Sequence, residues 1–284
     1  MHRLVSFFVG FAVFLLSPQS FSQEARQTPI SMCQAIADAG GIIRASAGGP
    51  ALRLAQLGPG DVNIRYVGHS TFRIEDATGL VVATDYSGQS GVGRLPDIVT
   101  MNNAHITHWT PAPDPAIPHV LEGWGRDGIP ADYNIQIGEV IVRNVTTDVN
   151  SQWAGQRING NSIFIFEMGG LCIGHLGHLH HILSDEHYAK IGRLDILMVP
   201  IDGGYTLNLP DMAAVVRRLN ASMILPMHWF SEFSLRRFIA SMEAGFPVDV
   251  RAQSGLTVNL NTLPPTATIT VLPPETHFGL GFSP

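Results

Sequence analysis

The fold class is decided by the stretch LDILMVPIDGGYT at residues 194–206, together with ILPMH at residues 224–228. Each begins as an apolar run of strand length and ends in residues that favour a turn or carry a polar side chain. Residues 210–219 between them have the pattern of a helix, and a second helix is predicted over 232–242. Strand and helix therefore alternate in this half of the chain, which is typical of an α/β protein with sheets inside and helices outside.

Further apolar runs extend the pattern toward the N-terminus. Ser184 is a candidate N-cap of another helix. No internal repeat is found, so residues 61–284 are predicted to form one domain. Residues 23–60 contain many glycines and prolines, which favour turns and loops, and residues 32–39 are weakly helical. The remaining predicted strands cover residues 62–67, 71–75, 80–84, 97–101, 134–145, 162–167 and 171–173.

The composition narrows the class of protein. The chain has 284 residues, of which 45% are hydrophobic and 14% are charged, so it can bury a full core. Its net charge is −6, and sixteen of its 17 basic residues are arginines that form no basic run. This distribution argues against a nucleic-acid-binding protein. Two cysteines are too few for a disulfide-rich scaffold.

The N-terminus has the pattern of a secretory signal. His2 and Arg3 precede an apolar run over residues 4–16, and the sequence Ser20-Phe21-Ser22 is typical of a signal-peptidase site. We therefore predict a signal peptide over residues 1–22, an extension over 23–60, and a periplasmic or secreted protein with no stable membrane span after cleavage. An uncleaved anchor is the alternative, although the apolar run is shorter than the roughly 20 residues that a spanning helix needs.

The two cysteines, Cys33 and Cys172, are compatible with two arrangements. In an oxidising compartment they could form a disulfide. Two separate buried thiols fit the sequence equally well, because spacing along the chain does not show proximity in space.

Histidines follow three predicted strands at their carboxyl ends. His105 and His108 follow the strand at 97–101, His178 follows the strand at 171–173, and His228 follows a strand at 223–226. Such loops are where α/β sheets usually place their sites. Neutral imidazole is a common zinc ligand, and an open catalytic site needs three protein ligands plus water. The pattern therefore predicts a metal site. A structural or hydrogen-bonding role is equally compatible for His119, His175, His180 and His181.

The order of these motifs resembles the metallo-β-lactamase-fold superfamily. The stretch IRYVGHSTFRI at residues 64–74 is followed by DIVT at 97–100 and then by the histidine motif. The run at 194–206, followed by ILPMH, is particularly similar to the branch of UlaG-like lactonases. The resemblance extends from about Val62 to Trp229. It implies a four-layer αββα sandwich and a metal-dependent hydrolase ancestry with a small-molecule substrate.

The metal-binding motif diverges from that of the superfamily. The family signature His-x-His-x-Asp-His stands here as NAHITH at residues 103–108, so the first histidine and the aspartate are missing. His178 occupies the position of the aspartate that usually bridges two metals. The middle-strand histidine has no counterpart, and Asp148 lies in that neighbourhood. The resemblance therefore does not imply a two-metal site of the usual kind.

By the resemblance, the surviving ligands belong to one of the two family sites. Substitution residue by residue leaves His108, His178 and His228 around one metal with water in the fourth position, while His105 as a fourth ligand would close the site. Every surviving ligand is a nitrogen donor, so we predict one zinc ion per chain, with manganese and iron as alternatives. No carboxylate offsets the charge of the ion, which favours an anionic substrate or hydroxide as the fourth ligand.

The functional prediction is a secreted metal-dependent hydrolase. Metal-activated water would attack the carbonyl or phosphoryl centre of a small ester, lactone, amide or phosphoester. Asp148 or His69 would accept the proton, and Tyr205, by the resemblance, would donate a hydrogen bond to the oxyanion. The alternative is a non-catalytic periplasmic relative that binds a metal or ligand and has lost hydrolysis. The sequence does not define the oligomeric state.

Overall fold

The computed structural model describes residues 29–35, 57–103, 105–151, 155–242 and 245–275. The predicted signal peptide and most of the predicted extension lie outside these residues. No helix in the described ranges is long and apolar enough to cross a membrane.

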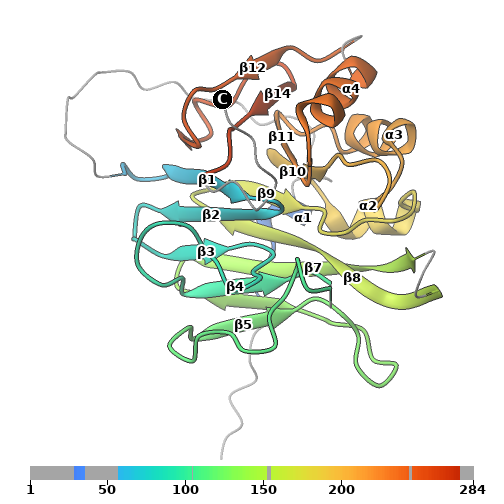
Figure 1. Ribbon diagram of the computed structural model, residues 1–284. Coiled ribbons are helices and arrows are strands. Elements are labelled where there is room, and N and C mark those ends of the chain that lie inside the picture. Colours follow the sequence, from blue (N-terminus) through green and yellow to red (C-terminus); the bar gives the residue numbers. More distant parts are fainter. Residues whose placement is uncertain (1–28, 36–56, 104, 152–154, 243–244, 276–284) are drawn as a thin grey trace, which may run out of the picture.

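Two packed β-sheets form the centre of the molecule (Figure 1). In the described chain the first sheet has six strands, in the order β13-β1-β2-β3-β4-β5. The pairs β1–β2 and β2–β3 are antiparallel, whereas β3, β4 and β5 are parallel. The strands of this sheet are β1 Val62–Gly68, β2 Thr71–Asp76, β3 Val81–Ala83, β4 Ile98–Met101, β5 His119–Glu122 and β13 Gly255–Val258.

The second sheet has eight strands within the described residues, in the order β12-β14-β11-β10-β9-β8-β7-β6. Strands β9, β10, β11 and β14 are parallel, and β6 to β9 form antiparallel pairs. Several polar side chains of the candidate site follow the parallel strands. The strands are β6 Asn134–Ile137, β7 Val140–Ser151, β8 Gly155–Met168, β9 Leu171–His175, β10 Ile196–Pro200, β11 Met223–Met227, β12 Val248–Val250 and β14 Thr268–Val271.

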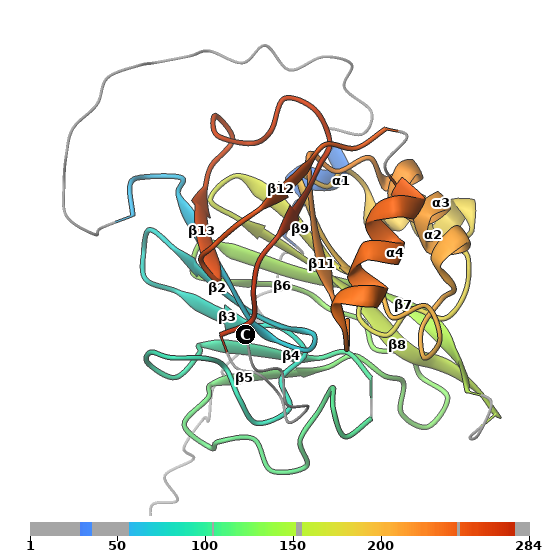
Figure 2. The same cartoon turned by 45° about the horizontal axis from the view of Figure 1, so that its top comes forward.

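The longer helices lie together on one side of the eight-stranded sheet (Figure 2). They are α2 Asp185–Ile191, α3 Leu209–Leu219 and α4 Glu232–Met242, and a short helix α1 Met32–Ala35 precedes them in sequence. Helix α3 buries Met212, Val215 and Val216, which lie on one face because they are spaced by three and four residues. Ser184 is the N-cap of α2, as predicted from the sequence.

Apolar side chains fill three layers. Phe72 of β2 and Phe166 of β8 belong to the layer between the sheets, while Leu197 of β10 and Phe238 of α4 belong to the layer under the helices. Loop residues such as Tyr86 pack on the outer face of the six-stranded sheet. The predicted α/β class with two packed sheets is confirmed, and the described helices α2, α3 and α4 form the outer layer on the eight-stranded sheet.

The predicted strand at 134–145 is a hairpin of β6 and β7. Gly138 has a φ of 58°, in the left-handed region that favours glycine, and it lies in the turn between the two strands. The other strands predicted from apolar runs are present with boundaries shifted by a few residues. Strands β5, β12, β13 and β14 were not predicted.

Cys33 and Cys172 form a disulfide, which settles the alternative that the sequence left open. The bond connects the segment at residues 29–35 to β9, with a Cα–Cα distance of 5.9 Å. The same segment is held by Glu167, whose carboxylate accepts hydrogen bonds from the Ser31 hydroxyl at 2.5 Å and the Met32 backbone N–H at 2.9 Å. Part of the predicted extension therefore packs on the domain.

Candidate metal centre

Residues that follow strands of both sheets come together in one histidine cluster. His69 lies in the turn between β1 and β2, His108 follows β4, and His228 follows β11. One ring nitrogen of each lies within 4.8 Å of the other two. His108 and His228 are 0% and 2% exposed, and His69 is partly buried. We refer to His69, His108 and His228 as the three-histidine group.

The ring of His108 is oriented by a buried carboxylate. Its Nδ1 contacts the carboxylate of Asp85, the second residue after β3, and lies 3.2 Å from the Ser70 hydroxyl. Its Nε2 is buried and has no hydrogen-bond partner in the described part of the chain. When Nδ1 donates to the carboxylate, Nε2 carries a lone pair, and this is the arrangement found behind metal-binding histidines.

A second carboxylate orients His228. Oδ1 of Asp202, the second residue after β10, lies 2.9 Å from Nδ1 of His228. The other ring nitrogen, Nε2, remains for a ligand. Asp202 also accepts hydrogen bonds from the backbone N–H groups of Gly204, Tyr205 and Thr206. One carboxylate therefore fixes both the histidine ring and the following turn.

His69 completes the group by a different route. It follows Gly68 in the hairpin turn, and its carbonyl oxygen accepts a hydrogen bond from the His228 backbone N–H at 2.6 Å. Nε2 of His69 is also buried without a hydrogen-bond partner among the described residues. Two unpartnered imidazole nitrogens that point into one cluster are unusual, because a buried polar atom normally has a partner.

The backbone is strained at this cluster. His69, Asp85 and His228 have φ values of 54°, 49° and 56°, in the left-handed region that side chains other than glycine rarely adopt. Such conformations cost of order 1–3 kcal/mol each and concentrate at functional sites. The fold therefore maintains an unfavourable local geometry at two of the three histidines and at the carboxylate behind the third.

Burial favours the neutral form of three histidine rings at the site, those of His69, His108 and His178. It lowers the pKa of His69 to about 3, helped by the neighbouring His228 and His108, and it lowers the pKa values of His108 and His178 well below the ordinary range. Burial acts in the opposite direction on Asp202, but hydrogen bonds from His228 and Thr206 outweigh it and hold the pKa of Asp202 below its usual range. Neutral imidazoles with carboxylates behind them are the form that binds a metal ion.

Burial raises the pKa of Asp85, and His175, the Ser70 hydroxyl and the Asn102 backbone N–H oppose that shift.

His175 itself forms a buried network rather than a ligand site. Its Nε2 lies 2.8 Å from the Ser70 carbonyl, and its Nδ1 lies near two donors, the Asn102 side-chain amide at 3.1 Å and the Gly177 backbone N–H at 3.0 Å. Both ring nitrogens are therefore used to hold the loops behind the three-histidine group.

His178 lies beside the three-histidine group. Its ring centroid is 4.5 Å from that of His108 and 5.3 Å from that of His228, and its Nδ1 is buried with no hydrogen-bond partner in the described ranges. The preceding Gly177 has a φ of 60°, and a Cβ there would lie 2.4 Å from Oδ1 of Asn161. That oxygen accepts the His178 backbone N–H at 2.7 Å. The absence of a side chain at residue 177 thus allows His178 to reach the cluster.

The other residues predicted from the sequence lie in different environments. His105 is exposed, with its Nδ1 3.0 Å from the Thr107 hydroxyl, and its ring centroid is 5.8 Å from that of His108. Asp148 accepts hydrogen bonds from the Asn159 backbone N–H and the Gln156 amide on the β7–β8 hairpin. The structure brings His69, which the sequence predicted as a proton acceptor, together with His108 and His228 in the three-histidine group, whereas His178, predicted as a ligand, lies beside that group. Tyr205 is at the edge of the site.

Sequence reasoning missed the two carboxylates. Asp85 and Asp202 each lie two residues beyond a strand, β3 and β10 respectively, so the rule that identified the histidines also applies to them. Their importance depends on the contacts to His108 and His228, which no local pattern shows.

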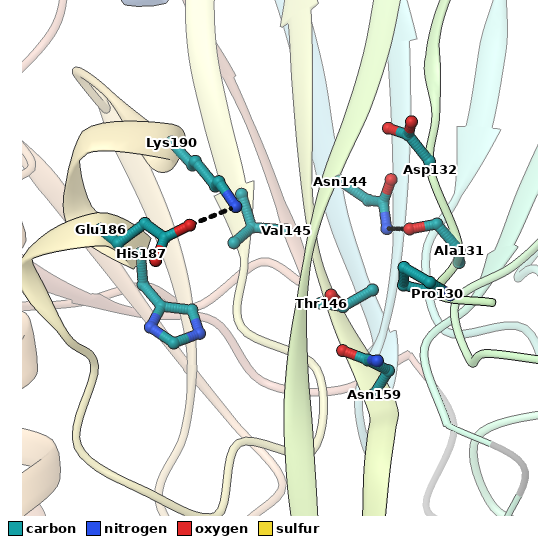
Figure 3. Close-up of a pocket in the computed structure, with 10 residues that line it drawn as sticks. All are labelled: Pro130, Ala131, Asp132, Asn144, Val145, Thr146, Asn159, Glu186, His187 and Lys190. Atoms are coloured by element: carbon teal, nitrogen blue, oxygen red, sulfur yellow. Dashed lines mark hydrogen bonds and ion pairs between the residues drawn. The ribbon is translucent and has the colours of Figure 1, made fainter. Parts of the chain in front are cut away.

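A pocket of about 420 Å³ lies apart from the three-histidine group and is lined by none of its members. Figure 3 shows its walls, formed by α2 on one side and residues 130–132 on the other, with Asn144 and Val145 of β7 between them. Glu186 and Lys190 form an ion pair of 2.7 Å within α2 at this pocket. All its charged side chains are at the surface, so the pocket does not have the unpartnered buried groups of the histidine cluster.

The chain belongs to the beta-lactamase superfamily. The family model described as the beta-lactamase superfamily domain matches residues 63–228, more than half of the chain, and this range includes every residue of the three-histidine group.

Individual relatives are similar over the same region. A UPF0173 metal-dependent hydrolase of Methanoculleus marisnigri is 22% identical over 182 residues, which cover 59% of this chain and 81% of the relative. A protein of the same name from Methanoregula boonei is 21% identical over 214 residues, covering 70% and 94%. A solved metallo-β-lactamase superfamily protein of Thermotoga maritima has a TM-score of 0.55 at 24% identity and covers 74% of this chain and 98% of its own. The similarity to the Thermotoga maritima structure shows the fold alone.

Proposed function

We propose that the protein is a metal-dependent hydrolase with a single metal ion held by His69, His108 and His228. The observation that carries the proposal is the convergence of three imidazole rings, one nitrogen of each lying within 4.8 Å of the other two. In two of them Nδ1 is held by a buried carboxylate, so that Nε2 is left for a ligand. The relatives named as metal-dependent hydrolases support the same class.

The donor set fits zinc best. Three imidazole nitrogens leave a fourth position open, which is the arrangement of catalytic zinc sites, and manganese or iron are the alternatives. A metal ion in such a site polarises a carbonyl or phosphoryl oxygen and lowers the pKa of bound water. The proposed reaction is hydrolysis of a small ester, lactone, amide or phosphoester. None of the three imidazoles carries a negative charge, so an anionic group on the substrate would add to the compensation that Asp85 and Asp202 provide behind His108 and His228.

The side chains around the three-histidine group have separate tasks in this proposal. Asp85 and Asp202 orient His108 and His228 and make their rings better donors. The unpartnered Nδ1 of His178 is available for a hydrogen bond to water or substrate. The hydroxyl of Tyr205, at the edge of the site, is the candidate donor to the oxyanion.

Elemental analysis of the purified mature protein tests the proposal, combined with assays against a panel of esters, lactones and phosphodiesters. We expect about one metal ion per chain and hydrolysis of at least one class. His108→Ala and His228→Ala should lose both metal and activity. His119→Ala is the matched control, because His119 begins β5, at the end of the parallel strands opposite to the loop that carries His108. A metal-loaded protein inert against the whole panel would favour the non-catalytic alternative.

We also propose that the protein is exported to the periplasm or secreted. The disulfide between Cys33 and Cys172 supports this location, because such bonds persist in oxidising compartments and are rare in the cytosol. The basic and apolar N-terminal pattern supports it independently. Intact-mass measurement on protein from a periplasmic extract should show a chain that begins at or close to Gln23. A full-length N-terminus would overturn this proposal.

A further inference from the structure

Two aromatic side chains lie next to the three-histidine group. The ring centroid of Phe230 is 5.6 Å from that of His69 and 5.1 Å from that of His228. Tyr205 meets Phe230 edge to face, with the ring centroids 5.9 Å apart. An aromatic surface thus begins at two of the proposed metal ligands and continues outward. We call Tyr205 and Phe230 the aromatic pair.

The aromatic pair is open to solvent despite its apolar character. Tyr205 is 66% exposed and Phe230 is 37% exposed. Single exposed apolar side chains are common on proteins, but a contiguous apolar surface beside a polar site usually marks a binding surface. Ile106, 78% exposed, adds another apolar side chain on the loop that carries His108.

The position of the aromatic pair is fixed by the site itself. Asp202 accepts the Tyr205 backbone N–H at 2.5 Å and the Thr206 hydroxyl at 2.5 Å, while its Oδ1 also lies 2.9 Å from Nδ1 of His228. Phe230 is two residues from His228 on the loop after β11. Both rings are therefore anchored to the backbone that positions a metal ligand, so their distance from the reacting centre is set by the fold.

We propose that the aromatic pair binds an apolar group of the substrate, an acyl chain or an aromatic ring next to the bond that is hydrolysed. This assignment rests on the proposed hydrolase function and narrows its substrate to an ester, lactone or amide that joins a polar reacting centre to an apolar group. Rigid aromatic side chains suit this task, because they provide a large contact area with little loss of conformational entropy.

The substrate test uses the metal-loaded enzyme and p-nitrophenyl esters of acetate, butyrate, hexanoate and octanoate. We expect kcat/KM to rise with chain length by up to roughly fourfold per buried methylene group. In Phe230→Ala and Tyr205→Ala this rise should flatten, mainly through a higher KM for the longer esters, so that the loss relative to the unchanged enzyme grows with chain length. Leu260→Ala is the matched control, since Leu260 follows β13 and its exposed side chain lies near Gly170 in the β8–β9 turn, away from the loops after β4 and β11.

Tyr205→Phe separates the ring from the hydroxyl. If the ring binds the apolar group, this variant keeps the chain-length dependence of KM. If the hydroxyl is an oxyanion donor as well, kcat falls for all esters alike. Loss of the chain-length dependence in Tyr205→Phe would contradict the assignment of the ring.

A binding measurement keeps the proposal testable without turnover. Calorimetry with octanoate and acetate, the carboxylate products of two of the esters, should show tighter binding of octanoate, and Phe230→Ala should remove the difference. An enzyme that hydrolyses esters but binds both carboxylates equally would overturn the aromatic-pair proposal alone. Absence of hydrolysis of every ester, lactone and phosphodiester would overturn the proposed function, whatever the binding result.

Discussion

Asp85 and Asp202 show how much of the site depends on residues that touch no ligand. Each contacts Nδ1 of one histidine, and each is almost completely buried at the carboxyl end of a strand. A carboxylate in this position fixes both the tautomer and the angle of the imidazole ring. The strength of metal binding should therefore depend on them nearly as much as on His108 and His228.

Asp85→Asn and Asp202→Asn should weaken metal binding by about 10–100-fold without abolishing it. The amide keeps the shape of the carboxylate but removes its charge and one acceptor oxygen. Competition with a chelator of known affinity measures the change. Complete loss of metal in both variants at unchanged folding would show that the carboxylates themselves are ligands.

His175 should make the metal-free protein sensitive to mild acid. Burial lowers its pKa below the ordinary 6.5, so below that pH the unfolded chain binds a proton that the folded chain does not bind until lower pH. The free energy of unfolding should therefore decrease as the pH falls through this window. Urea denaturation at several pH values measures the slope, and His175→Gln should be less stable by about 1–3 kcal/mol at neutral pH with a shallower slope.

At the scale of the elements, the sequence predicted the strands that bury both faces or alternate clearly. It missed β12, whose Val248 and Val250 are exposed, the partly exposed β5 and β13, and the largely buried β14, whose threonines interrupt its apolar pattern. These strands are held by pairing with a neighbour, as β13 is by β1, and such long-range pairing leaves no local apolar pattern. The helices were predicted well because their apolar stripes and caps are local.

The same distinction explains the site. His108, His178 and His228 were selected from the sequence because each follows a strand, whereas the place of His69 in the three-histidine group depends on a hairpin turn that comes near β11. Nothing in the sequence near residue 69 indicates that contact. Likewise, an aspartate after a strand is common in turns, so Asp85 and Asp202 did not stand out.

Gly177 lies in the turn after β9, and its substitution tests whether the position of His178 matters. Gly177→Ala should destabilise the fold by about 1–3 kcal/mol or more and displace His178, because the added Cβ would lie 2.4 Å from Oδ1 of Asn161 and 2.7 Å from Nδ2 of Asn102. Gly128→Ala is the matched control. Gly128 has a φ of 81°, but no described atom lies within 4 Å of the added Cβ, so only the backbone strain applies.

Thermal melting and activity of the two glycine variants provide the measurement. We expect Gly128→Ala to lose stability alone and Gly177→Ala to lose activity as well. Equal activity in both would mean that the position of His178 does not matter for the reaction.

For the whole molecule, the disulfide should contribute a large share of the net stability. Cys33 and Cys172 are 139 residues apart in sequence, so the bond restricts a long segment of the unfolded chain. The double variant Cys33→Ser and Cys172→Ser should be less stable by about 2–5 kcal/mol in urea denaturation. Metal content should be unchanged, because the disulfide joins β9 at Cys172, ahead of the residues that form the site. Stability that does not respond to the double variant or to reductant would contradict the prediction.

The three proposed ligands come from different sheets, and this has a mechanical consequence. His69 and His108 are carried by the six-stranded sheet and His228 by the eight-stranded sheet, so a bound ion cross-links the two halves of the sandwich. Side chains such as Phe72 and Phe166 determine the spacing between the sheets. This spacing in turn determines the distance between His228 and the other two histidines. Coordination tolerates displacements of only about 0.5 Å. A change of volume in that apolar layer, which contains no residue of the three-histidine group, would therefore change the metal affinity.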